Sequence, residues 1–141
     1  MIKGVEYAGT EFGRESNLDL SIAGSSVKFQ IEHPYRGKYA LSMIVDGLTM
    51  DPVKTYGYDA ILKVKIYTDT KIYLEKTVAN KVSPFWGTEG ESGFTILRYR
   101  CPDECPLDKP VTVEVTVEKP SASFYKRYPL KAVTITKGSD L

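Results

Sequence analysis

Apolar and polar residues alternate along much of this chain with a period of two. In the clearest run, residues 111–118, every second residue is valine and the residues between are Thr or Glu. The same alternation recurs in residues 18–22, 27–31 and 62–67. Successive side chains of a β-strand point to opposite faces, so each run predicts a strand with one buried and one solvated face.

A second group of segments predicts further strands with less regular patterns. Residues 39–45 place Tyr39, Leu41, Met43 and Val45 on one side, while Ile44 on the other side predicts a central strand covered on both faces. The other candidates are residues 72–79, 94–100, 132–137, 5–8 and 124–128.

The segments between the predicted strands are rich in turn residues. Asp69 and Thr70 predict a hairpin connection that brings Ile66 near Ile72. Residues 47–58 and 80–93 are longer, contain Pro and Gly, and show no clear period, so we interpret both as loops.

Short strands with single apolar faces must bury those faces against one another. We therefore predict an all-β fold, an antiparallel β-sandwich of about eight or nine strands with immunoglobulin-like architecture. A closed β-barrel is the alternative, although the two long loops break the even strand spacing typical of barrels. The chain has 141 residues and a mass of 15.8 kDa, which predicts a single domain over 1–141.

Charge and hydropathy exclude some classes of partner. Lys and Arg number 19 against 18 for Asp and Glu, so no bulk field favours nucleic acid or an anionic membrane. The basic and aromatic segment 124–128 is interpreted as an edge strand rather than a nucleic-acid site. No apolar run approaches the ~18 residues of a membrane span. Residues 1–6 show no signal-peptide pattern, which leaves export open.

The only cysteines, Cys101 and Cys105, lie close together in a segment with two prolines and an Asp. We predict a disulfide that closes this tight loop, with two free thiols as the alternative. A metal or redox site is the third interpretation, disfavoured because zinc needs further ligands and His33 is distant in sequence. A disulfide favours a periplasmic or extracellular location, and we predict no metal or cofactor.

Residues suited to catalysis are few in this sequence. The one histidine, His33, precedes Pro34 and is interpreted as a turn residue at a strand end rather than as a general base. Neither Gly24-Ser25-Ser26 nor the serine at 92 matches a nucleophile elbow. We therefore predict a protein that is not an enzyme, with a glycoside hydrolase as a further alternative. Its candidate carboxylates are Asp51, Asp59, Glu89, Glu91, Asp103 and Glu104.

Aromatic residues in the predicted turns and loops supply the candidate binding site. These are Trp86, Phe85, Tyr56, Tyr58 and Tyr35. Rings in loops on a rigid scaffold can form contacts with another protein or stack on sugars, whereas Phe85 and Trp86 can also fold back and close the end of a sandwich. We predict a protein partner, with a carbohydrate-binding module as the alternative.

One short motif and one stretch carry a resemblance to known proteins. Tyr99-Arg100-Cys101 resembles the Tyr-x-Cys of immunoglobulin domains, although the earlier partner cysteine of that family is missing. The residue pattern and the turn within residues 27–45 resemble those of small exported sandwich domains of uncharacterised bacterial proteins, lipoproteins among them. The resemblance implies a non-catalytic binding domain of an exported bacterial protein.

Overall fold

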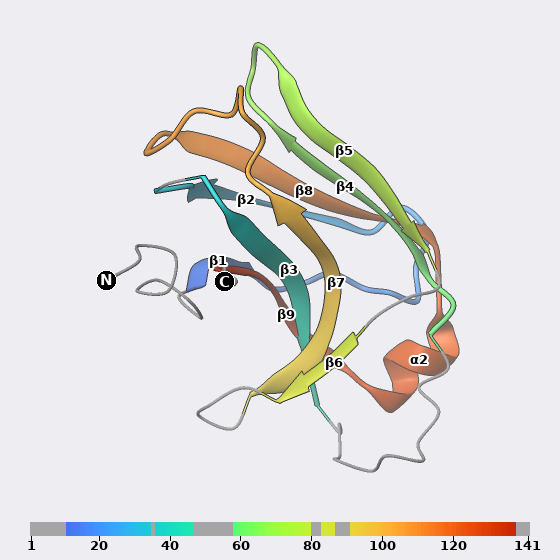
Figure 1. Ribbon diagram of the computed structural model, residues 1–141. Coiled ribbons are helices and arrows are strands. Elements are labelled where there is room, and N and C mark those ends of the chain that lie inside the picture. Colours follow the sequence, from blue (N-terminus) through green and yellow to red (C-terminus); the bar gives the residue numbers. More distant parts are fainter. Residues whose placement is uncertain (1–10, 35, 47–57, 80–82, 87–90, 138–141) are drawn as a thin grey trace.

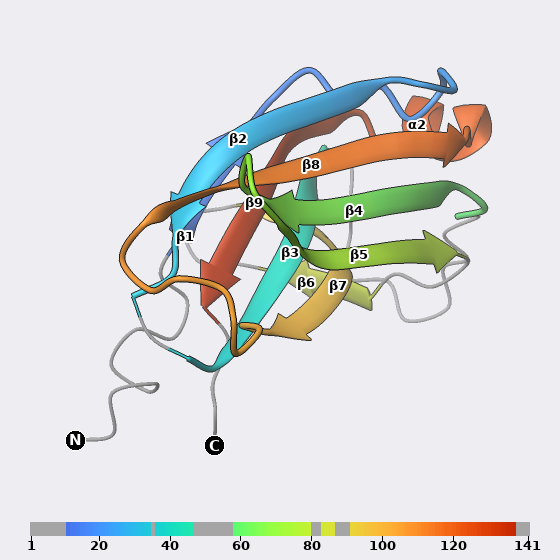
Figure 2. The same cartoon turned by 90° about the horizontal axis from the view of Figure 1, so that it is seen from above.

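The chain folds into two antiparallel β-sheets packed against each other, seen from two directions in Figures 1 and 2. This computed structural model describes residues 11–34, 36–46, 58–79, 83–86 and 91–137. The elements are β1 (Glu11–Glu15), β2 (Ser26–Glu32), β3 (Lys38–Val45), β4 (Ile61–Tyr67), β5 (Ile72–Ala79), β6 (Ser83–Trp86), β7 (Ser92–Arg100), β8 (Pro110–Lys119), α2 (Ala122–Arg127) and β9 (Leu130–Lys137).

The strands form a sandwich and do not close into a barrel. Five strands pair in the order β1-β9-β3-β7-β6, and four pair in the order β2-β8-β4-β5. The prediction of an antiparallel sandwich is therefore confirmed, and the closed-barrel alternative is wrong. Strands β1 and β2, at corresponding edges of the two sheets, also contact each other.

The alternating segments form the core as their pattern predicts. The valines of β8, from Val111 to Val117, are at most 1% exposed, and Val115 pairs with Val27 of β2. Strand β3 lies between β9 and β7, and Ile44 on its other face is 4% exposed. Strand β3 is thus a central strand buried on both faces. Burial of these apolar faces is the main favourable term in folding such a domain.

The predicted hairpin at Asp69-Thr70 is present. The backbone N–H of Thr68 donates to the carbonyl of Lys71, and that of Lys71 donates back to Thr68. A register shift next to the turn pairs Ile72 with Tyr67 and leaves Ile66 opposite Leu74. The hairpin is therefore confirmed, and the neighbour of Ile66 is displaced from the predicted residue.

Residues 18–22 were expected to form a strand and instead form a turn, although Leu18 and Leu20 are buried as their alternation predicts. The cause is local hydrogen bonding. The carboxylate of Asp19 accepts from the backbone N–H of Ser21 at 2.9 Å, and the N–H of Asp19 donates to Ser25 Oγ at 2.9 Å. Side chains of this type offer the backbone a partner that competes with a strand ladder.

Two other predictions need correction. Residues 124–128 contribute to the short helix α2 rather than to a strand, because helical spacing lets both Phe124 and Tyr128 reach the core. The predicted loop 80–93 contains strand β6, which pairs with β7 from Ser83 to Trp86. The predicted strand 5–8 lies outside the described residues.

Aromatic side chains fill the end of the sandwich beside α2. Phe124 lies 5.1 Å from Tyr58, Phe94 and Tyr128 between ring centroids. Figure 2 shows α2 at one end of β8 and the connection from β7 to β8 at the opposite end.

Within the described residues, no helix has the length and apolar character needed to cross a bilayer.

Candidate functional site

The connections β2–β3 and β7–β8 bring the single histidine and both cysteines together. A nitrogen of the His33 ring and the Sγ atoms of Cys101 and Cys105 all lie within 4.8 Å of one another. The three residues are 0%, 2% and 0% exposed. We call this group the thiol–imidazole cluster. It lies at the end of the sandwich opposite α2.

Both ring nitrogens of His33 face a polar side chain, one from Tyr99 and one from Cys105. Nε2 lies 2.9 Å from the hydroxyl of Tyr99, and Nδ1 lies 3.8 Å from Cys105 Sγ. The ring of Tyr39 packs edge-on against the imidazole with centroids 4.6 Å apart. These contacts fix the plane of the imidazole and direct Nδ1 toward the cysteines.

Backbone hydrogen bonds tie the two connections to each other. The N–H of Cys101 donates to the carbonyl of Gly37 at 2.8 Å, and the N–H of Asp108 donates to the carbonyl of His33 at 2.9 Å. Within the β7–β8 connection, the N–H of Cys105 donates to the carbonyl of Pro102 at 3.0 Å. These hydrogen bonds therefore fix the backbone of both cysteines.

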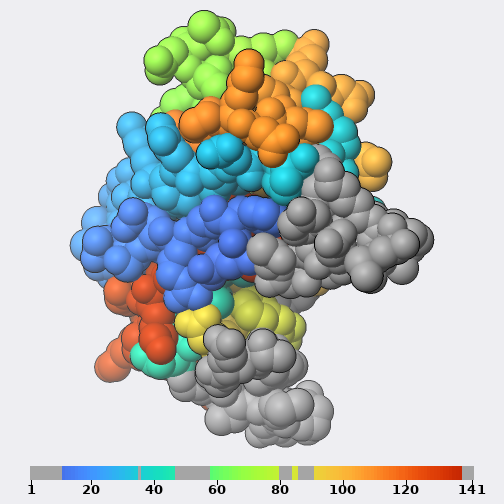
Figure 3. All heavy atoms as spheres, turned by 90° about the vertical axis from the view of Figure 1, so that its left-hand side faces the viewer, coloured from blue at the N-terminus to red at the C-terminus, as the bar shows by residue number. Residues whose placement is uncertain are grey.

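Arg36 adds a positive charge at the edge of the cluster. Its guanidinium donates to the carbonyls of Pro102 and Cys105, the latter at 2.6 Å, and lies 3.4 Å from Cys101 Sγ. One side chain thus spans the turn between the two cysteines. Figure 3 shows the orange surface of the β7–β8 connection lying against the blue surface of β2 on this side of the molecule.

Burial shifts the pKa values of His33 and Cys105 in the directions that favour their neutral forms. Desolvation, together with the charge of Arg36, lowers the pKa of His33 to about 4. Desolvation and the neighbouring Cys101 raise the pKa of Cys105 to about 12. At neutral pH the cluster therefore holds a neutral imidazole beside the neutral thiol of Cys105.

The sequence interpretation of His33 missed this arrangement. His33 does follow the last residue of β2, as expected for a strand-end residue, but its side chain is buried rather than exposed in a turn. Distance along the chain was the reason for separating it from the cysteines, and that reason is wrong because β2 and β8 are paired neighbours. The two thiols are free in the structure. The disulfide, and the exported location that depends on it, stay predictions.

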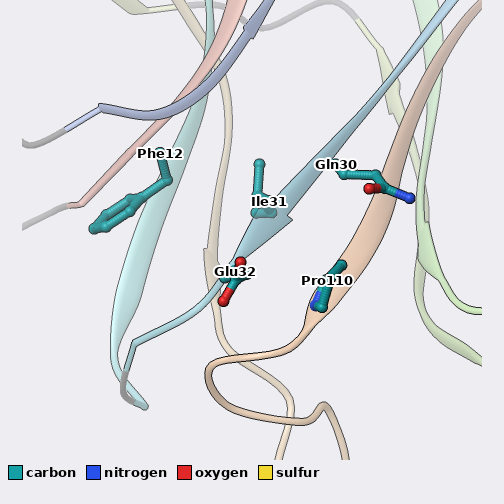
Figure 4. A pocket seen from close by; sticks show the side chains of 5 residues that line it. All are labelled: Phe12, Gln30, Ile31, Glu32 and Pro110. Atoms are coloured by element: carbon teal, nitrogen blue, oxygen red, sulfur yellow. The ribbon is translucent and has the colours of Figure 1, made fainter.

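A hollow of about 360 Å³ lies near the cluster, at the edge where β1, β2 and β8 meet. Figure 4 shows the side chains that line it, which are Phe12, Gln30, Ile31, Glu32 and Pro110. The ring of Phe12 also packs on Tyr39, and the Tyr39 ring in turn packs against His33. The hollow and the thiol–imidazole cluster therefore share one supporting ring.

The predicted aromatic site is only partly described by the structure. Phe85 is half-buried in the edge strand β6. Tyr58 is half-buried, and its ring packs edge-on against Phe124 in the aromatic end of the core. Trp86 belongs to β6, with its side chain outside the described atoms, and Tyr35 and Tyr56 lie outside the described residues. The aromatic site as a whole stays a prediction.

The candidate carboxylates are spread over different parts of the surface. Glu91 is bound by Arg14, whose guanidinium nitrogens lie 3.0 and 2.7 Å from its oxygens. Asp59, Asp103 and Glu104 are exposed, and Glu104 pairs with Lys71. Asp51 and Glu89 lie outside the described residues.

Comparison with known proteins found no match to a family model, to a curated protein or to a solved structure.

Proposed function

We propose that this chain is a non-catalytic binding domain that holds a segment of another protein in the hollow between β1, β2 and β8. The carrying observation is the composition of its lining: an apolar ring from Phe12, the ring of Pro110, and the polar ends of Gln30 and Glu32. Ligand sites typically combine apolar walls with a few placed polar groups. The volume of about 360 Å³ suits a side chain or a short peptide segment.

The lining favours a basic side chain as the anchor. An arginine can lay its aliphatic stem on Phe12 and Pro110 while its guanidinium pairs with the carboxylate of Glu32. The amide of Gln30 offers an additional acceptor. Arginine is also among the residues that most often dominate protein interfaces. We therefore expect an exposed arginine in the partner segment.

A binding role also agrees with the enclosure of the thiol–imidazole cluster. Its three side chains are at most 2% exposed, so a substrate in solution cannot contact them in this conformation. The rigid sandwich below the hollow supports a preformed site, since loops and edges on such scaffolds commonly carry recognition.

The test is an NMR titration of the ¹⁵N-labelled protein with short capped peptides that contain Arg, Lys or Glu. The Arg peptide should move backbone signals of residues 12, 30–32 and 110, and the Glu peptide should not. Phe12→Ala and Glu32→Gln should each remove most of the response. Glu118→Gln is the matched control, because Glu118 is an exposed carboxylate at the other end of β8.

Two outcomes contradict the proposal. One is a response to the Arg peptide that survives Glu32→Gln, because the hollow would then not be the site. The other is a response of the same residues to neutral oligosaccharides in place of the peptides, which would support a carbohydrate-binding module.

A further inference from the structure

We propose that the thiol–imidazole cluster is a binding site for Cu(I), with Cys101 Sγ, Cys105 Sγ and His33 Nδ1 as its three ligands. Thiolate and imidazole are the donors that soft, late first-row ions prefer, and thiolate selects Cu(I) and Zn(II) over hard cations. The inference is separate from the peptide-binding role proposed above, because it uses different residues in the core.

The spacing of the ligand atoms fits a metal at their centre. With bonds of about 2.3 Å to sulfur and about 2.0 Å to nitrogen, a trigonal ion separates nitrogen from sulfur by about 3.7 Å. Nδ1 of His33 lies 3.8 Å from Cys105 Sγ. All three ligand atoms lie within 4.8 Å of one another, so small side-chain rotations bring them to one ion.

The number of donors favours Cu(I) over Zn(II). Structural zinc takes four protein ligands, and catalytic zinc with three protein ligands keeps an open fourth position for water or substrate. His33, Cys101 and Cys105 are at most 2% exposed, so this cluster has no fourth position open to solvent. Among the residues that the structure describes, no carboxylate joins His33, Cys101 and Cys105 in the group. The hydroxyl of Tyr99 faces Nε2, on the side of the imidazole away from Nδ1. A three-coordinate soft ion matches this set.

The local charge leads to the same choice. Binding of Cu(I) releases the proton of each thiol to solvent. The two thiolates with one Cu(I) then carry a single negative charge, and the guanidinium of Arg36 lies 3.4 Å from Cys101 Sγ to balance it. With Zn(II) the two thiolates are already neutralised, and the half-buried guanidinium of Arg36 would have no negative charge to balance. A cation beside the ligands therefore favours the complex that keeps a negative charge.

Tyr99 positions the histidine for this role. When Nε2–H donates to the Tyr99 hydroxyl at 2.9 Å, the lone pair of Nδ1 is free to face the cysteines. Metal-binding histidines usually have such a partner on the second nitrogen, and loss of the partner weakens metal binding by about 10–100-fold. Tyr99 is therefore a positioning residue and not a ligand.

The composition of the chain makes the test direct, because it has only two cysteines and one histidine. The reduced, metal-free protein is titrated with Cu(I) under argon in competition with bicinchoninate. We expect one tightly bound Cu(I) per chain. X-ray absorption of the copper complex should show two sulfur ligands at about 2.3 Å and one nitrogen at about 2.0 Å. Absence of retained copper, or a shell without nitrogen, would overturn the proposal.

Variants assign the ligands and the positioning residue. Cys101→Ser and Cys105→Ser should each weaken Cu(I) binding by more than about 100-fold, beyond the loss expected for a supporting partner. Tyr99→Phe should weaken it by about 10–100-fold. Tyr67→Phe is the matched control and should leave it unchanged, because the Tyr67 hydroxyl donates a hydrogen bond of the same length, 2.9 Å, to Glu114 on the outer face of the sheet.

A wild-type measurement keeps the proposal testable if the cysteine variants fail to fold. Cu(I) is diamagnetic, so its addition should shift the ring signals of His33 in the NMR spectrum without broadening them. Unmoved ring signals would overturn the ligand set. Preferential retention of Zn(II) over Cu(I) would overturn the choice of ion, and a chain that forms the Cys101–Cys105 disulfide and binds no copper after reduction would overturn the site.

Discussion

Nδ1 of His33 lies 3.8 Å from Sγ of Cys105, although the two residues are 72 positions apart in the sequence. The contact exists because His33 follows β2, Cys105 precedes β8, and β2 pairs along its whole length with residues 110–116 of β8, with Glu32 opposite Pro110. Adjacent strand ends thus bring two distant connections together, and the hydrogen bond from Asp108 to His33 holds them there.

The buried face of β8 predicts a large difference between two neighbouring substitutions. Val115 is fully buried, so Val115→Asp places an unpaired charge in the core and should cost at least about 3 kcal/mol of unfolding free energy. Thr116→Asp, one position along and on the outer face, should change it by less than about 1 kcal/mol. Chemical denaturation of both variants checks this, and equal losses would mean that the faces are assigned wrongly.

Gly93 should tolerate no side chain. A Cβ at this position would lie 1.9 Å from the carbonyl oxygen of Met43 on the neighbouring strand β3, so Gly93→Ala should cost more than about 3 kcal/mol. Gly24 has open space around it and a φ of +87°, so Gly24→Ala should cost only about 1–2 kcal/mol of backbone strain. Thermal melting of the two variants separates a packing clash from strain, and a Gly93→Ala protein as stable as Gly24→Ala would contradict this pairing of β3 and β7.

Glu91 should titrate below an ordinary glutamate. The hydrogen bonds from Arg14 lower the pKa of Glu91, and Lys131 adds to the effect. Its contribution to stability is therefore present at neutral pH and lost as the pH falls through the lowered pKa of Glu91. Both side chains are more than a third exposed, so the pair should contribute less than about 1 kcal/mol.

Side-chain NMR titration measures this pKa directly. Arg14→Ala should return the pKa of Glu91 to the usual range, whereas Arg127→Ala, on α2, should leave it unchanged. A normal pKa for Glu91 in the unmodified protein would show that the ion pair does not form in solution.

The metal-free protein should lose stability in mild acid through His33. Its folded pKa of about 4 lies below the ordinary value of 6.5, so the unfolded chain binds the proton first. The contribution of neutral His33 to the free energy of unfolding is fully present above pH 6.5. It is lost as the pH falls toward the folded pKa of His33, and the loss amounts to about 2–3 kcal/mol. Urea denaturation at several pH values checks this, and His33→Gln, if folded, should flatten the profile between pH 4 and 6.5.

Much of the fold could be predicted from hydrophobic periodicity. The valine alternation predicted the inner and outer faces of β8, and Ile44 predicted that β3 is buried on both faces. Both predictions succeed because inner and outer positions of a strand differ in polarity. Periodicity was insufficient at Asp19, whose side chain and backbone form local hydrogen bonds in place of a strand ladder. It was also insufficient at Phe124 and Tyr128, where six residues of helix are too short for a clear helical pattern.

The candidate site was harder to predict, for a physical reason. The cysteines were identifiable as a pair in one turn, but the position of His33 beside them depends on which strands pair, and strand order is not encoded in local patterns. Likewise, the hollow combines Phe12 from β1 with residues of β2 and β8, and β1 was not among the predicted strands.

The enclosure of His33 beside the two cysteines is the central claim, and the ring signals of this single histidine test it most directly. We predict that, in the reduced and metal-free protein, long-range ¹H–¹⁵N NMR shows a neutral ring protonated on Nε2 at pH 5.5. The ring should titrate near pH 4, as its burial requires. A ring that titrates near 6.5 and exchanges between tautomers would show that His33 faces water, and the thiol–imidazole cluster would then not exist in solution.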